Sequence, residues 1–265
     1  MATKNTMTKE DLRAKKKNES DAVVYKVMIA LIILCGAAMG LRALRGYYAT
    51  TDGFIALYDL TPVIAIAGLA LAAVCGVLLA VCKNKVVRLV MPWAITLSLL
   101  AAATGWIMRE SGAADFTFLY FLCFAVLVQY IILQLYRWEF FLFSLSTVTA
   151  GGLFYCFSRG MYFTGRNIVM LVALLLVLAG TAWCTLKAFR SNGWLVFGPV
   201  KIHLLNAKSL PILTLAVDVL WLICTLAVLI LGTVGGMGGL FAYYCMFAAI
   251  AVEFIAAVYY TFQLN

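Results

Sequence analysis

The sequence predicts an all-α protein, a polytopic integral membrane helical bundle of about eight transmembrane helices with both termini in the cytoplasm. Composition is the first reason, since 65% of the 265 residues are hydrophobic, only 12% are charged and the mean hydropathy is +1.03. A soluble globular domain has nearer ~45–50% apolar and ~25% charged residues, so that class is excluded. The apolar residues also form runs of about 20 residues, the length that crosses a ~30 Å hydrocarbon layer as a helix.

Hydrophobic length divides the chain into a basic cytoplasmic tail, residues 1–22, and a single transmembrane domain, residues 23–265. The fifth of the eight runs in this domain is the shortest. The predicted crossings, in order, are Val23–Arg42, Leu60–Cys82, Val86–Met108, Phe116–Tyr136, Phe140–Phe157, Asn167–Lys187, Leu210–Leu231 and Leu240–Phe262.

Small residues recur in the first two crossings. Gly36 and Gly40 have GxxxG spacing in the first crossing. In the second, every fourth residue is small: Gly68, Ala72 and Gly76. Such stripes let helices approach closely in lipid, so they indicate packing and not chemistry. The connection between these crossings, residues 46–59, is longer than a turn and is expected to lie along the membrane surface.

The later crossings carry polar residues and longer connections. On the fifth crossing one face is polar: Ser144, Thr147, Gly151, Tyr155 and Ser158. This face predicts hydrogen bonds between helices in preference to a permeation path. Residues 188–209 predict an interfacial segment broken at Gly198–Pro199, or a loop that rests on lipid. The glycine-rich run 232–239 predicts a flexible hairpin turn, not a nucleotide-binding loop.

The basic residues predict the orientation. If the amino terminus faces the cytoplasm, fifteen of the 20 Lys and Arg residues lie on the cytoplasmic side and five on the opposite side. This is the asymmetry of the positive-inside rule, and losing one crossing from the middle would destroy it. The short loops and compact size suit a plasma membrane, in particular a bacterial inner membrane.

The tail holds seven of the basic residues within the first 26 positions. A basic segment beside a membrane fixes orientation and contacts anionic headgroups. The residues expected at the membrane surface are Lys15, Lys16, Lys17, Trp194 and Lys201. No nucleic-acid partner is expected, because no platform of aromatic and basic residues accompanies the charge. The expected partners are the lipid bilayer and either another membrane protein or a second copy of this chain.

No cofactor or metal is expected, and no catalytic residue can be named. The eight cysteines lie within or at the ends of predicted crossings without a CxxC pair, and His203 is the one histidine of the sequence. Such a set offers no cluster of zinc or haem ligands. Walker A, HExxH and GxSxG motifs are also missing from the sequence.

Two acidic residues lie at predicted membrane depth. Asp218 is nine residues after Ser209, and Glu253 is nine residues before Phe262. A central carboxylate costs roughly +2.5 to +3.5 kcal/mol on the insertion scale, so its presence suggests a role. Antiparallel helices would bring both acids to one level, where two carboxyl groups could share a proton or bind a cation. The residues expected along this path are Asp218, Glu253, Thr214, Thr225, Gln129 and Gln134.

Three classes of function fit this pattern. The leading one is a small-solute or ion carrier that uses the two carboxyl groups. A non-catalytic subunit or scaffold of a membrane complex is the alternative, with the tail or residues 188–209 as its docking surface. A membrane-embedded enzyme that acts on lipid-linked substrates is the third. A carrier predicts a polar cavity at the acids, a scaffold a filled interior, and an enzyme an interfacial groove with several polar groups.

Overall fold

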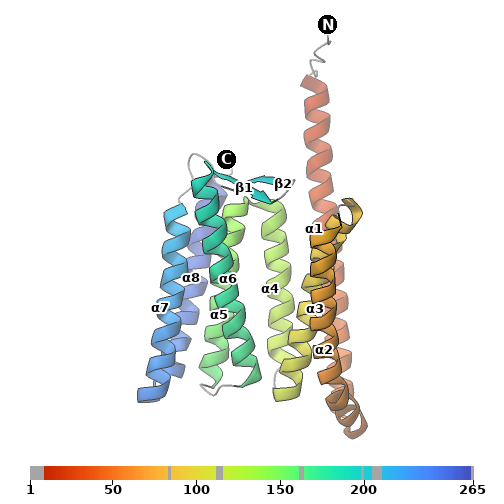
Figure 1. Cartoon of the computed structure of the whole chain (residues 1–265), viewed down its shortest axis with the longest axis vertical. Helices are drawn as coiled ribbons and strands as arrows, with labels where there is room; N and C mark the ends of the chain where they lie inside the picture. Colours follow the sequence, from red (N-terminus) through yellow and green to blue (C-terminus); the bar gives the residue numbers. More distant parts are fainter. Residues whose placement is uncertain are drawn as a thin grey trace.

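The computed structural model describes residues 9–82, 85–111, 116–160, 164–197, 200–204 and 211–263. In these residues the chain forms eight α-helices and one two-stranded sheet (Figure 1). The helices are α1 (Lys9–Tyr48), α2 (Thr51–Val81), α3 (Lys85–Ser111), α4 (Phe116–Leu135), α5 (Trp138–Arg159), α6 (Gly165–Arg190), α7 (Pro211–Gly235) and α8 (Gly238–Gln263). The strands are β1 (Trp194–Phe197) and β2 (Val200–His203).

The predicted all-α membrane bundle is confirmed. Seven of the helices found in the described residues are long and apolar enough to cross a membrane. The exception is α3, which has 27 residues but a shorter apolar stretch, Leu97–Trp106. Eight crossings and cytoplasmic termini therefore stay predictions. In Figure 1 the start of α1, the end of α8 and the β1–β2 hairpin all lie at the same end of the molecule.

Two connections differ from the sequence-based expectation. Residues 46–59 are mostly helical, because α1 runs to Tyr48 and α2 starts at Thr51. Thr50 caps α2, since its Oγ1 accepts a hydrogen bond from the Gly53 amide at 3.2 Å. Such a cap satisfies an amide that would otherwise lack a partner, and this explains the short turn.

The second difference is in residues 188–209, which contain a β-hairpin in place of an interfacial segment or loop. Trp194 pairs with His203 and Phe197 with Val200 in antiparallel register. Leu195 is buried against the end of α6 together with Ala188. The predicted break at Gly198–Pro199 lies outside the described residues.

The helices α4 to α8 enclose the main core. α5 is central to it and contacts α4, α6, α7 and α8. Its side chains Leu153, Phe154 and Phe157 are fully or almost fully buried, and Trp221 of α7 packs edge-on against Phe154. The glycine-rich run 232–239, predicted as a flexible hairpin turn, is helical up to Gly235 and again from Gly238, so the turn between α7 and α8 is shorter than predicted. Gly236, in this turn, adopts a positive φ of 64°.

The helices α1 to α3 form a separate layer beside this core. α2 and α3 are closely packed, because a Cβ on Gly68 would lie 2.7 Å from the Ser98 carbonyl oxygen. On the same seam, a Cβ on Gly105 would lie 2.8 Å from the Thr61 carbonyl oxygen. Close packing at Gly68 was expected from its stripe. Gly36, Gly40 and Gly76 instead have no such neighbour within 4 Å.

Candidate functional site

The first acid, Asp218, is buried between three helices. It lies on α7, seven residues after the helix begins at Pro211, and is 5% exposed. Thr181 of α6 donates a hydrogen bond from Oγ1 to Asp218 Oδ2 at 2.7 Å. Ser146 of α5 also lies within hydrogen-bonding reach of the carboxyl group. Asp218 thus joins α7 to α6 by a hydrogen bond and lies beside α5, where the Ser146 hydroxyl donates to the Phe143 carbonyl oxygen at 2.9 Å.

The second acid, Glu253, lies on α8 and joins a chain of polar side chains. Gln129 of α4 donates from Nε2 to Ser144 Oγ at 2.8 Å. Ser144 of α5 in turn donates to Glu253 Oε1 through a short hydrogen bond. This chain links α4, α5 and α8. Ser144 and Gln129 are buried and Glu253 is half-buried.

The two acids lie at one level but on opposite sides of α5. Their partners Ser144 and Ser146 are two residues apart, which on a helix is a rotation of about 200°. The partners of both acids lie within about 15 Å of the bundle end that carries the hairpin, because a helix rises 1.5 Å per residue. The carboxyl groups therefore do not form a direct pair. Instead, α5 separates them.

A third interhelical hydrogen bond joins α5 to α7 in the same turn of α5. Trp221 of α7 donates a hydrogen bond from Nε1 to Thr147 Oγ1 of α5 at 3.3 Å. Ser144, Ser146 and Thr147 thus give α5 three buried hydroxyl groups within one turn. A hydroxyl group both donates and accepts, so this turn can serve neighbours on several sides. Of the polar face predicted for α5, Ser144 and Thr147 bond to neighbouring helices, whereas the Ser158 hydroxyl donates to the Tyr155 carbonyl oxygen within α5.

Each acid has one carboxyl oxygen that lacks a hydrogen-bond partner. These atoms are Asp218 Oδ1 and Glu253 Oε2, and both are buried. The Gln129 Oε1 atom, in the chain that leads to Glu253, is also buried without a partner. The described side chains that act on the two carboxyl groups are Thr181, Ser146 and Ser144, and none of these carries a charge. A buried ionised group with no counter-charge is costly, so neutral acids or a bound cation fit these positions better.

A groove reaches Glu253 from the side of the bundle. It lies between α4, α5 and α8, has a volume of about 200 Å³ and is lined mostly by apolar side chains. Thr147, Tyr155 and Glu253 are its polar residues. A larger cavity of about 460 Å³ lies elsewhere, between α1, α3 and α4. Asp218 lines neither of these two cavities, so neither is the polar cavity that a carrier predicts at both acids, and neither gathers several polar groups at an interface.

The remaining residues of the predicted path form no hydrogen bond with the acids in the part of the chain that the structure describes. Thr214 is buried one turn before Asp218 on α7. Thr225 is also buried, and its hydroxyl donates to the Trp221 carbonyl oxygen at 2.7 Å. Gln134 is half-buried at the end of α4 that leads to α5. Of the predicted path, the structure thus links Gln129 to Glu253 by hydrogen bonds, through Ser144.

The sequence did not predict Thr181 and Ser146 as neighbours of Asp218. Both are buried hydroxyl residues on apolar helices, a common pattern that carries no mark of an acid nearby. It also missed Glu139, which is 4% exposed at the start of α5 and lies within hydrogen-bonding reach of Tyr260 on α8. Glu139 lies in the first turn of α5, and an acidic residue at the start of a helix was the sequence signal that could have drawn attention to it.

The residues predicted at the membrane surface lie at two places. Lys15, Lys16 and Lys17 belong to the first half of α1, where the backbone is helical. Trp194 is exposed on β1, and Lys201 lies on β2. Since the hairpin and the start of α1 lie at one end of the molecule, all five residues belong to that end (Figure 1).

The sequence matches no protein-family model, and comparisons with curated proteins and with solved structures found no match. The class that the fold defines is a polytopic α-helical membrane protein.

Proposed function

We propose that this protein is a membrane carrier of protons or of a small cation, with Asp218 and Glu253 as the binding groups. The observation that carries the proposal is the bare, buried oxygen on each carboxyl group, next to an oxygen that a hydroxyl group holds in place. An ionised acid at membrane depth is costly without a partner. Each acid is therefore expected to hold a proton or cation, and its exchange is the elementary step of a carrier.

The sizes of the cavities favour a proton or a small ion over a larger solute. The groove that reaches Glu253 holds about 200 Å³ and is mostly apolar, whereas ligand pockets usually hold about 300–1,000 Å³. A proton needs no cavity of its own. It needs only groups that can bind it and neighbours that can adjust their hydrogen bonds.

The hydroxyl groups of α5 provide such neighbours. Ser144 lies beside Glu253, Ser146 lies beside Asp218, and Thr147 follows Ser146 directly in the sequence. Because a serine hydroxyl can rotate, it can donate to an ionised carboxylate and accept from a protonated one. The turn of α5 between the acids is therefore suited to follow a change in the charge of either acid.

The location proposed for this activity is a plasma membrane, in particular a bacterial inner membrane. The fifteen-to-five division of basic residues supports eight crossings with both termini in the cytoplasm. The position of the start of α1 and the end of α8 at the same end of the molecule agrees with an even number of crossings (Figure 1).

Reconstitution into vesicles tests the proposal. Vesicles that contain the protein and a pH-sensitive dye in their lumen should acidify when an imposed potential drives protons inward. Asp218→Asn and Glu253→Gln should each abolish this flux, because an amide cannot release or bind the proton. Asp59→Asn, at an exposed acid of α2, is the matched control and should retain the flux. Flux that persists in the double variant of Asp218 and Glu253 would refute the proposal.

A second candidate function is a non-catalytic subunit of a membrane complex, or a self-associating scaffold. Its supporting observation is α1, because none of the residues in its apolar window is buried inside the protein. A Cβ added at Gly36 or Gly40 of this helix would also meet no atom of the described residues within 4 Å. Extraction in mild detergent would test this candidate. A scaffold should keep a partner protein or a second copy bound after extraction, and the Asp218→Asn and Glu253→Gln variants should fold normally.

A further inference from the structure

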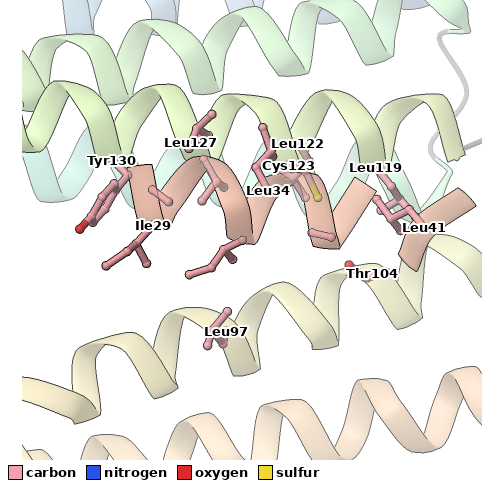
Figure 2. Close-up of a pocket in the computed structure, with 14 residues that line it drawn as sticks. Ile29, Leu34, Leu41, Leu97, Thr104, Leu119, Leu122, Cys123, Leu127 and Tyr130 are labelled. Atoms are coloured by element: carbon pink, nitrogen blue, oxygen red, sulfur yellow. The ribbon is translucent and has the colours of Figure 1, made fainter. Parts of the chain in front are cut away.

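The larger of the two cavities lies apart from the two acids. It is a groove of about 460 Å³ between α1, α3 and α4, and 14 residues line it. Two of the lining residues, Thr104 and Tyr130, have a polar hydroxyl group, and the others are apolar residues or cysteine. Figure 2 shows these side chains, drawn as sticks, converging from the three helices. A groove of this composition at membrane depth suits a hydrocarbon chain.

The groove runs along α1. Ile29 and Tyr130 lie at one end of it, as Figure 2 shows. Leu41 and Leu119 lie at the other end. Ile29 and Leu41 are twelve residues apart, so the groove is about 18 Å long at a rise of 1.5 Å per residue. One leaflet contributes about half of a ~30 Å hydrocarbon layer, so this length is enough for one lipid chain.

Two positively charged residues of α1 lie close to the Leu41 end of the groove. The α1 residues Ile33, Ala37 and Leu41 line the groove at intervals of four. Four residues further on the same stripe is Arg45, in the last turn of α1, and its side chain is exposed. Residues four apart on a helix lie on one face. The exposed residue Arg45 therefore lies one turn beyond Leu41, at this end of the groove.

A second arginine and a buried cluster also lie at this end of the groove. Arg42, directly after Leu41, is also exposed. Below the groove, Tyr48, Met108 and Phe116 form a buried cluster that joins the ends of α1 and α3 to the start of α4. This cluster holds the helix ends in place, so that the arginines and the groove keep one geometry. The combination is an apolar slot with fixed positive charge at one mouth.

We propose that this groove binds one anionic phospholipid, with an acyl chain between α1, α3 and α4 and the phosphate at Arg45 and Arg42. The lipid is a structural ligand of the α1 layer, and the proposal does not depend on the carrier function. It accounts for an apolar space between helices and for two exposed arginines at the end of a transmembrane helix. A guanidinium group suits phosphate because its N–H donors match the geometry of two phosphate oxygens.

Native mass spectrometry of the detergent-solubilised full chain tests the proposal, with phosphatidylglycerol as the probe and phosphatidylcholine as the zwitterionic control. The chain should retain one phosphatidylglycerol and exchange phosphatidylcholine readily. Arg45→Gln should weaken phosphatidylglycerol retention about fivefold, the effect of one basic residue near an anionic lipid. Arg159→Gln is the matched control, because Arg159 is an exposed arginine at the end of α5 whose guanidinium lies over Tyr155.

A second pair of variants tests the groove itself. Ala37→Phe places a ring in the groove and should reduce lipid retention, whereas Met39→Phe, at a residue 74% exposed and about 200° away on α1, should not. Equal retention by these two variants, or equal retention of both lipids by the wild-type chain, would overturn the proposal. So would a wild-type dimer that Ala37→Phe dissociates, because a second copy would then fill the groove. Loss of proton flux in the acid variants has no bearing on these outcomes.

Discussion

The two halves of the molecule are held together by different means. In the α5 span, 61% of the residues of the most apolar window are buried inside the protein, whereas none of the corresponding α1 residues is. The α4–α8 bundle has a continuous core of aromatic and aliphatic side chains. It also has hydrogen bonds between helices, such as those of Ser144 and Thr181. The α1–α3 layer depends on a glycine seam and a small cluster at one end.

This difference shows how helices associate where water is absent. Lipid is as apolar as a leucine side chain, so no hydrophobic force drives helices together inside the bilayer. Close packing and interhelical hydrogen bonds remain as the cohesive interactions. The α4–α8 bundle uses both, and the α2–α3 pair uses close backbone approach at Gly68 and Gly105. The α1 layer leaves space that another molecule can fill.

The largest expected effect on the free energy of unfolding comes from a substitution in the core of the α4–α8 bundle. Trp221→Ala removes a side chain that is 1% exposed and packs against Phe154, so it should lower the free energy of unfolding by about 3–5 kcal/mol. Trp106→Ala, at a half-exposed residue of α3, should change it by less than about 0.5 kcal/mol. Thermal unfolding in detergent measures both. Equal effects would mean that the bundle core is no more cohesive than the outer layer.

The next effect is on the seam of the outer layer. Gly68→Ala places a Cβ 2.7 Å from the Ser98 carbonyl oxygen, so α2 and α3 must separate, at a cost of about 1–3 kcal/mol. Gly76→Ala has no neighbour within 4 Å and serves as its control. Thermal unfolding, together with the yield of a disulfide cross-link between cysteines introduced into α2 and α3, reports the separation. An unchanged cross-link yield and melting temperature in Gly68→Ala would contradict the close seam.

The smallest effect concerns the hydrogen bonds of the bundle. Ser144→Ala removes the link between Gln129 and Glu253, and such interhelical bonds contribute about 0.6–1.7 kcal/mol in membranes. Ser158→Ala is the control, because the Ser158 hydroxyl donates to the Tyr155 carbonyl oxygen within α5. The difference between the melting temperatures of the two variants measures the contribution of the interhelical hydrogen bonds to stability. If Ser158→Ala costs as much as Ser144→Ala, the chain through Ser144 adds nothing to bundle stability.

Much of the fold was predictable because the bilayer restricts the choice of structure. A backbone in hydrocarbon must satisfy its own hydrogen bonds, so each long apolar run has to form a helix. The run at α5 was the shortest expected crossing, and it is a helix of 22 residues. The hairpin of β1 and β2 was not expected, because its pairing depends on how Leu195 is buried against α6 and not on the local sequence pattern.

The candidate site was predictable only in part. Asp218 and Glu253 stand out because acids are rare in apolar runs, and their common level follows from the helix lengths. The residues that surround the two acids were not predictable in the same way. Thr181 and Ser146 contact Asp218 because of the rotation of α5 and α6 about their axes, which a membrane-spanning pattern hardly constrains.

By itself, the sequence determined that the chain is a bundle of membrane helices with two acids inside it, because hydrophobic length and the cost of a buried charge depend on local composition alone. Only the tertiary structure decided that α5 stands between those acids and that α1 borders an open groove. Both depend on how the helices rotate and pack against each other, and in a solvent that treats every apolar face alike this is settled by contacts between residues far apart in the chain.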